Sequence, residues 1–307
     1  MDLKEPLSIE KQVERLKEHG LSIKNESFAK EMLSRTSYYR FTGYAIQFRK
    51  NESSSEFVEN ISFEMVYKIY EFDKKLREII RSYIEIAEIY YRTQIAHIFS
   101  MIKCKNPPHD QHYDDNNYCN KRGFQEILQS LSREQVHLKD SLVVKHHKQK
   151  YADKMPLWVC VELLSFSNIS KLYGSMYISD KTTIAQELNT GASTLENHLH
   201  CLSVLRNKCA HAARLYNSKV SPPARFNSKY LRSHPEMKND TLFAYLLVLH
   251  KRLPTDQDRG ALKNDLMLLF SAYEKNISLD LMGVPKNWEK LMTTNQSSFK
   301  MITGTIQ

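Results

Sequence analysis

The sequence predicts an all-α fold, and three observations support this prediction. Apolar residues recur at intervals of about three to four positions through most of the 307-residue chain, which is the period of an amphipathic helix. Glycine occurs only 8 times, which disfavours turn-rich all-β architectures and glycine-rich phosphate loops. Hydrophobic residues make up 41% of the chain and charged residues 26%, as in globular proteins. This length accommodates one large helical domain or two smaller ones.

Two short helices are expected in an N-terminal helical region that comprises residues 1–50. The first follows Ser8, a favourable N-cap residue, and ends at Gly20, a common C-terminal signal. The second spans residues 26–35. A polar loop with turn composition, residues 51–56, separates this region from the predicted main bundle.

The segment Ser37-Tyr38-Tyr39-Arg40-Phe41-Thr42-Gly43-Tyr44 is unusually aromatic. One interpretation is a platform on which RNA bases stack, with Tyr39 and Arg40 as contacts. The other is a hydrophobic seam that joins two lobes of the protein. The seam is favoured, because aromatic rings clustered in a short segment usually pack in a core.

Residues 62–102 contain the longest periodic segment and lack glycine and proline. We expect one long helix, or two helices with a break near Asp73. The pairs Arg81–Glu85 and Glu88–Arg92 have the i,i+4 spacing of helical ion pairs. Most of these pairs are expected at the surface, where each adds only a few tenths of a kcal/mol.

The next loop contains three residues that are metal ligands by type: His109, His112 and Cys119. The loop begins with Pro107-Pro108 and is rich in Asp and Asn, which is typical of a solvated segment. No second cluster completes a tetrahedral ligand set. We therefore predict no metal site and no cofactor.

Two further helices are expected before the segment that carries the chemistry. Residues 124–148 end in a basic run that contains Lys145 and Lys148, either a solvated helix end or a phosphate-contacting patch. Residues 157–174 form a strongly apolar helix in which Glu162 either faces the arginines of the long helix or complements the helix dipole. Asp180 is expected to cap a shorter helix, residues 181–188.

The segment 191–217 is predicted to form an amphipathic helix with a reactive face. Ser193 and Glu196 have capping-box spacing, and neither glycine nor proline follows until Pro222. Helical periodicity separates an apolar stripe from a polar one. The apolar stripe contains Leu202, Leu205, Cys209 and Ala213; the polar stripe contains Ser203, Asn207, His211 and Arg214, with Arg206 on the border.

The remaining chain, residues 221–307, is predicted to form a C-terminal helical extension. Residues 221–237 are expected to form an irregular basic arm, because Pro222-Pro223 interrupts the helical pattern. Amphipathic helices are expected at about 240–252 and 259–276, and a final short helix is expected after Trp288.

The composition favours a polyanionic partner and a reducing compartment. The net charge is +9, which suits nucleic acid or an anionic membrane, although it also serves solubility. The 17 Tyr and 13 Phe add surfaces on which single-stranded RNA could stack. The 5 cysteines are scattered, no apolar signal-peptide segment begins the chain, and no apolar run reaches the length of a membrane span. We expect a cytoplasmic protein that binds no membrane.

Arg206, Asn207 and His211 supply the groups needed for RNA cleavage without a metal. An imidazole exchanges protons near neutral pH, and a guanidinium binds phosphate oxygens through its planar fork. His211 would move a proton at the 2′-hydroxyl or the leaving 5′-oxygen, while Arg206 stabilises the developing negative charge. The expected products are a 2′,3′-cyclic phosphate and a 5′-hydroxyl.

The spacing of Arg206 and His211 also favours a homodimer. The two positions are separated by about 140° around a straight helix, so their side chains do not stack. Two copies related by a twofold axis would place one such helix against the other and create a composite cleft.

Several segments resemble the Abi family of bacterial abortive-infection proteins, of the AbiD/AbiF group, which is placed in the HEPN superfamily. The superfamily mark is R-x(4–6)-H, often with Asn after the Arg. The matching segments are Leu205-Arg206-Asn207-Lys208-Cys209-Ala210-His211 with Arg214-Leu215-Tyr216-Asn217, Ser37–Tyr44 (I-S-Y-Y-R-L-x-G-Y), Tyr70–Arg77 (Y-x-F-D-x-x-L-R), Tyr91-Arg92-Thr93 (L-R-T) and Pro156–Phe166 (P-x-W-x-x-x-E-x-L-S-F). Two positions depart from the family pattern: Tyr216, where Trp is usual, and Ser167, where Gly is common.

The resemblance implies a HEPN-type helical bundle, here residues 51–220, with additional N-terminal and C-terminal helices. It also implies a toxin-like, metal-independent endoribonuclease of phage defence, in which Arg206 and His211 are catalytic and Asn207 supports them. As further RNA contacts we expect Arg214, Asn217, Tyr39, Arg40, Lys145 and Lys148.

Two other functions remain compatible with the sequence. The chain could be a non-catalytic RNA-binding protein that holds a structured noncoding RNA. It could also be a purely structural interaction protein whose polar helix face forms a dimer seam.

Overall fold

The computed structural model describes residues 3, 5–51 and 53–293, and all regular elements in these residues are helical. Isolated β-bridges join only single pairs of loop residues. The all-α prediction is therefore confirmed. The α-helices are α1 (Ile9–Glu18), α2 (Glu26–Thr36), α3 (Tyr38–Ala45), α4 (Phe63–Lys103), α5 (Lys121–His137), α6 (Leu142–Tyr151), α7 (Leu157–Leu163), α8 (Phe166–Ser175), α9 (Ile178–Glu187), α10 (Ala192–Ala210), α11 (Ser228–Ser233), α12 (Leu242–Arg252), α13 (Asp256–Ala272) and α14 (Trp288–Leu291).

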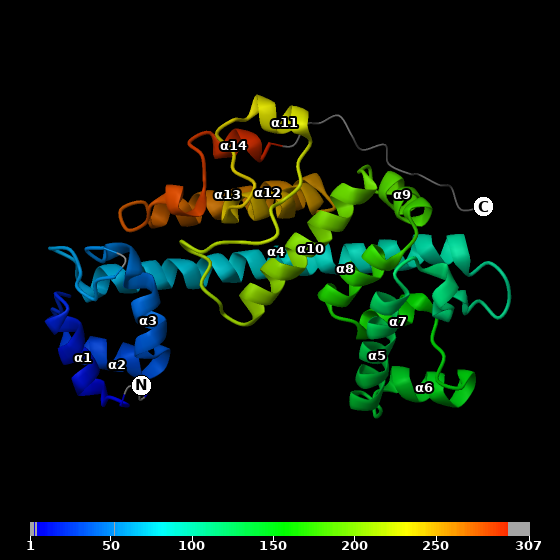
Figure 1. Ribbon diagram of the computed structural model, residues 1–307, viewed down its shortest axis with the longest axis horizontal. Coiled ribbons are helices and arrows are strands. Elements are labelled where there is room, and N and C mark those ends of the chain that lie inside the picture. The colour runs from blue at the N-terminus through cyan, green and yellow to red at the C-terminus, as the bar shows by residue number, and fades with distance from the viewer. Residues whose placement is uncertain (1–2, 4, 52, 294–307) are drawn as a thin grey trace.

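Helix α4 is the axis of the molecule. It runs unbroken for 41 residues, so its length is about 60 Å. Figure 1 shows α1–α3 at one end of α4, α5–α9 at the other, and α12 and α13 along its length, with α10 crossing near its middle. The predicted alternative of a break near Asp73 is wrong, because Asp73 lies inside the helix with a fully buried side chain.

One continuous hydrophobic core links these elements. The buried cluster extends from Val13 in α1 to Met292 beyond α14. Helix α3 contributes Phe41 and Tyr44 to this core, as the seam interpretation expects, while Tyr39 is 89% exposed. The predicted domain boundaries near residues 50 and 220 both lie outside helices. No helix within the described residues combines the length and the apolarity needed to cross a membrane.

Side-chain caps explain why two predicted helices are each divided into two. Residues 124–148 contain a turn between α5 and α6, and the Ser141 side chain accepts a hydrogen bond from the amide of Val144 at the start of α6. The apolar helix expected at 157–174 ends at Leu163, and Ser165 caps α8 by accepting from the amide of Asn168. Single Ser residues gave too weak a signal for these breaks to be predicted.

The start of α10 and the role of Asp180 also differ from the predictions. Helix α10 begins after Gly191, which provides no side-chain cap, and Ser193 lies inside the first turn. Asp180 does not cap α9 but lies within it, buried, with Oδ2 2.9 Å from Nζ of Lys103 at the end of α4. A carboxylate that pairs with a neighbouring helix is not available to its own helix terminus.

Two histidines are buried in α10 and in α12 of the C-terminal extension. His198 of α10 donates from Nε2 to the carbonyl of Arg225 at 2.7 Å, and His250 lies buried in α12. Burial lowers the pKa of His198 to about 3 and that of His250 to about 4. Both rings are therefore neutral in the folded protein under conditions in which the unfolded chain already binds protons.

This difference predicts acid sensitivity. Because the folded pKa values lie below the ordinary value of 6.5, the unfolded state binds more protons between pH 6.5 and about 4, and stability falls as the pH is lowered through that window. Each histidine should contribute a loss of roughly 1–2 kcal/mol between pH 7 and pH 5. Urea unfolding across this range measures it. The His198→Gln variant should show a shallower pH dependence than the wild type.

Gly283 is a second point of constraint, since its φ of +72° is left-handed and a Cβ there would overlap the side chain of Thr241. We expect Gly283→Ala to destabilise the protein by about 1–3 kcal/mol. Gly260 of α13 is the matched control, because no atom lies near its Cβ position. Gly260→Ala should raise stability by about 0.5–1 kcal/mol through helix propensity. Equal urea midpoints for the two variants would contradict this account.

Candidate functional site: the C-terminal end of α10

Arg206 lies near the end of α10 and faces α4. Its Nε is 3.4 Å from Oε2 of Glu88, and its side chain remains 40% exposed. Within the described part of the chain, no residue pairs with its two terminal nitrogens, Nη1 and Nη2. The guanidinium is therefore held along one edge and open along the other.

Asn207 turns toward a different neighbour. Its Nδ2 donates to Oγ of Ser167 in the first turn of α8 at 3.0 Å. Ser167 is one of the two positions that depart from the family pattern, and glycine at this position would remove the hydrogen-bond partner. The structure thus explains the side chain found there.

His211 is the C-cap residue of α10, so the helix ends earlier than predicted. The two following residues close the helix: the amide of Ala212 donates to the carbonyl of Cys209, and that of Ala213 to the carbonyl of Lys208. With φ of +49° at Ala212, this is the pattern of a Schellman motif. The His211 ring is exposed, and no residue in the described ranges hydrogen-bonds to it.

The prediction of a helical polar stripe that extends to Arg214 is therefore wrong. Residues 213–217 form a loop, here called the post-helix loop, that ends in a turn and contacts Asp73 of α4. The loop contains neither glycine nor proline, so its departure from the helix is imposed by tertiary contacts.

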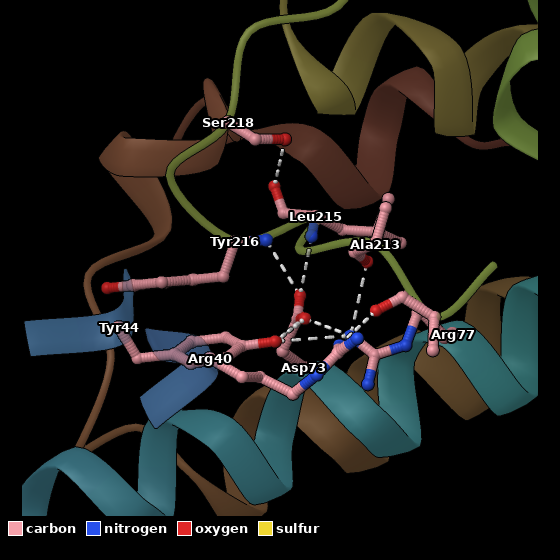
Figure 2. A network of polar contacts seen from close by, with 9 residues as sticks. Arg40, Tyr44, Asp73, Arg77, Ala213, Leu215, Tyr216 and Ser218 are labelled. Carbon is pink, nitrogen blue, oxygen red and sulfur yellow. Dashed lines mark hydrogen bonds and ion pairs between the residues drawn. The ribbon is translucent and has the colours of Figure 1, made fainter. Parts of the chain in front are cut away.

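Asp73 of α4 supplies the most important of these contacts. Its Oδ1 accepts from the amides of Leu215 at 3.0 Å and Tyr216 at 2.7 Å, and its Oδ2 accepts from the hydroxyl of Tyr44 at 2.6 Å. Arg77, one turn further along α4, pairs with the same carboxylate and donates to the carbonyl of Ala213 at 3.3 Å. Figure 2 shows these groups converging on Asp73 beneath the loop.

This network is buried, and Tyr44 remains protonated within it. Asp73 is fully buried and Arg77 is 5% exposed. Burial and then the adjacent carboxylate raise the pKa of Tyr44 well above its ordinary value, so its hydroxyl remains a donor at neutral pH. A buried charge is stable only when it is paired and hydrogen-bonded, and Asp73 meets both conditions.

Two arginines predicted to contact RNA also fasten the post-helix loop. Arg40 donates from Nη1 to the carbonyl of Ala212, and Arg214 donates from Nη1 to the carbonyl of Gly43 in α3. Each guanidinium therefore donates at least one hydrogen bond to the backbone. Together they connect α3 to the start of the loop.

A second charged cluster lies between α4, α7 and α10. Arg92 donates from Nη2 to Glu88 Oε1 at 2.8 Å and to the carbonyl of Leu164 at 3.0 Å. Its Nη1 is 3.7 Å from Oε2 of Glu162, which is 60% exposed. Glu162 thus faces an arginine of the long helix, which confirms the first of the two interpretations given for it. The Glu88–Arg92 pair is largely buried, contrary to the expectation of a surface pair.

The remaining predicted RNA contacts lie apart from the end of α10. Lys145 and Lys148 are exposed on α6, which Figure 1 places at the lower edge of the molecule, and Lys145 pairs with Asp140 at 3.2 Å. Tyr39 is exposed on α3. Asn217 lines an open cavity of about 610 Å³ between the post-helix loop and the C-terminal extension.

The residues considered as metal ligands by type contact other groups of the protein. His112 lies between Cys104 Sγ and the carbonyl of Met155, and Cys119 contacts the carbonyls of Ser175 and Met176. No group of three or more His, Cys, Asp or Glu side chains is arranged to hold a metal within the described residues.

Cys209, next to the reactive stretch, is fully buried, and burial raises the pKa of its thiol to about 12. A protonated, inaccessible thiol is not a nucleophile. The candidate chemistry of this helix end therefore belongs to Arg206, Asn207 and His211.

The sequence patterns indicated no role in the site for Glu88, Asp73 or Ser167. A usable signal existed for the two acids. Asp73 lies between Ile69 and Leu76 on the apolar stripe of α4, so helical periodicity places a charge where an apolar residue is expected. Glu88 similarly follows buried Ile84 by four positions. Such a charge must meet a partner inside the protein.

Comparison with known proteins identifies the family to which the chain belongs. A family model described as Abi-like protein matches residues 31–217, which is more than half of the chain. The matched range ends with the last residue of the post-helix loop. The chain has no match among curated proteins or among solved structures.

The Asp73 network predicts a large stability effect. Asp73→Ala leaves Arg77 buried without its partner and two loop amides unsatisfied, so we expect a loss of about 3–5 kcal/mol in the free energy of unfolding. Glu78→Ala on the same helix is the control, because its ion pair with Lys74 is exposed and long, at 3.9 Å. That variant should change stability by no more than about 1 kcal/mol. Similar urea midpoints for the two variants would refute the central role of Asp73.

Proposed function

Because the chain belongs to the Abi-like protein family, we propose that it is a metal-independent endoribonuclease of the HEPN type that acts in abortive-infection defence against phage. One observation carries the proposal. At the end of α10, Arg206 presents an open guanidinium edge while His211 presents an exposed imidazole. A phosphate-binding cation and a proton-transfer group are the two functions that RNA transesterification requires.

The chemistry follows from these two side chains. The 2′-hydroxyl of the RNA is the nucleophile, so the protein needs to supply neither a nucleophile nor a metal-bound water. His211 removes or returns a proton, and the terminal nitrogens of Arg206 bind the non-bridging phosphate oxygens as negative charge develops. Asn207, fixed by Ser167, supports this arrangement.

We further propose that the active form is a homodimer assembled through the motif helix. Two exposed apolar residues flank the charged cluster: Ile89 of α4 is 53% exposed and Trp158 of α7 is 56% exposed. Ile89 is three residues from Arg92 and Trp158 four residues from Glu162, so each shares a helix face with a member of the cluster. A second copy would cover these side chains and bring a second Arg206–His211 pair to the cleft.

The other predicted RNA contacts form an outer surface in this proposal. Tyr39 offers an exposed ring for stacking, Lys145 and Lys148 offer phosphate contacts on α6, and Asn217 offers an amide at the rim of a cavity. Arg40 and Arg214 would contribute charge while they remain bound to the backbone.

Substitution of the two reactive residues tests the proposal. Arg206→Ala and His211→Ala should each lower the rate of RNA cleavage by about 100-fold or more, and EDTA should have no effect. The products should carry 2′,3′-cyclic phosphate and 5′-hydroxyl ends, which end-labelling reveals. His200→Ala on the exposed side of α10 and Arg133→Ala on α5 are matched controls that should retain activity.

Two outcomes would overturn the nuclease assignment. Full activity in both reactive-site variants, or loss of activity on addition of EDTA, contradicts the proposed mechanism. A salt-sensitive RNA complex that survives His211→Ala, with no cleaved ends from the wild-type protein, identifies the alternative function: a non-catalytic protein that holds a structured noncoding RNA.

A further inference from the structure

We infer that Glu88 is a positioning residue that fixes the guanidinium of Arg206 in the orientation that receives a phosphate. This inference rests on the proposed function of the Arg206 site. It adds to that site a carboxylate from another helix that touches no substrate atom and acts through Arg206.

The carboxylate of Glu88 divides its two oxygens between two arginines. Oε1 accepts a hydrogen bond from Arg92 Nη2 at 2.8 Å, while Oε2 lies 3.4 Å from Arg206 Nε. The Glu88 residue is only 9% exposed. Within the structure's described ranges, no third group competes for these oxygens.

Arg92 in turn prevents the carboxylate from turning. Its side chain is 13% exposed, and its Nη2 also donates to the carbonyl of Leu164, where α7 ends. Glu162 lies on its other terminal nitrogen, Nη1, at 3.7 Å. The end of α7 therefore fixes Arg92, and Arg92 fixes Glu88.

The edge of Arg206 that Glu88 engages decides which edge remains free. A guanidinium has five N–H donors in one plane, and the Nε edge faces the carboxylate. Among the described residues, none pairs with Nη1 or Nη2, and the side chain that carries them is 40% exposed. Two parallel donors in this geometry match two non-bridging oxygens of one phosphate.

Glu88→Gln is a sharp test because an amide has one acceptor oxygen instead of two. It can serve Arg92 or Arg206 but not both, and it removes the charge that draws Nε toward α4. We expect Glu88→Gln to lower kcat/KM for RNA cleavage by about 10-fold or more through misplacement of Arg206. The control is Glu85→Gln, an exposed residue one turn earlier on α4 with no ion pair among the described residues, and it should match the wild type.

A double-mutant cycle separates positioning from a merely structural role. The cycle measures RNA affinity in the His211→Ala background and combines Glu88→Gln with Arg206→Lys. Lysine keeps the positive charge but has no Nε–H edge for Glu88 to orient. Glu88→Gln should weaken RNA binding about 3- to 10-fold when Arg206 is present and should have no further effect when lysine replaces it.

Circular dichroism and thermal unfolding of every variant test whether the fold is retained. An equal effect of Glu88→Gln with and without the Arg206→Lys substitution overturns the inference, since Glu88 would then act on the fold alone. Tighter RNA binding by Glu88→Gln also overturns it, because Glu88 would compete with phosphate for the guanidinium. If the wild type binds RNA without cutting it and the coupling is present, the nuclease proposal fails while the positioning role stands. If the wild type binds no RNA, both fail.

Discussion

A single buried carboxylate determines where the reactive helix stops. Asp73 binds two successive backbone amides of the post-helix loop, and Arg77 balances its charge. Removing a buried charge from its partners is costly, so the loop has one permitted path over α4. Since that path begins directly after α10, it also fixes the last turn of the helix and the place from which His211 projects. The position of His211 therefore depends on a contact made by a distant side chain of α4.

The segments that resemble the Abi family are distant in sequence but meet around this helix end. Helix α3 reaches the loop through Arg40 and Tyr44, and the segment Tyr70–Arg77 of α4 supplies Asp73 and Arg77. Arg92, in the segment Tyr91–Thr93, holds the carboxylate of Glu88. Most of these side chains hold backbone or orient another side chain. They share one task, which is to build the surroundings of Arg206 and His211.

The sequence predicted helices well where the signal lies in neighbouring residues, such as a capping side chain or the apolar period. Ser8 caps α1 as expected, and the apolar period identified residues 62–102 as a long helix. The end of α10 could not be predicted in this way, because Ala212 carries no turn signal and the force that stops the helix comes from Asp73, well over a hundred residues earlier in the chain. Candidate site residues were recognisable by type, but Glu88 required knowledge of which neighbour its carboxylate meets.

The unbroken course of α4 has a consequence for how this protein can change over evolution or in engineering. Asp73 and Glu88 lie on one continuous helix, about 22 Å apart along its axis. Glu88 contacts Arg206, and Asp73 accepts hydrogen bonds from the loop that follows α10. Inserting one residue between them would rotate Glu88 by about 100° relative to Asp73 and carry it off the face that meets α10. Side chains on the solvent side of this stretch can be exchanged, but its length cannot change freely. Even an insertion of one whole turn, which keeps Glu88 on the same face, would move it about 5.4 Å along the axis from Arg206.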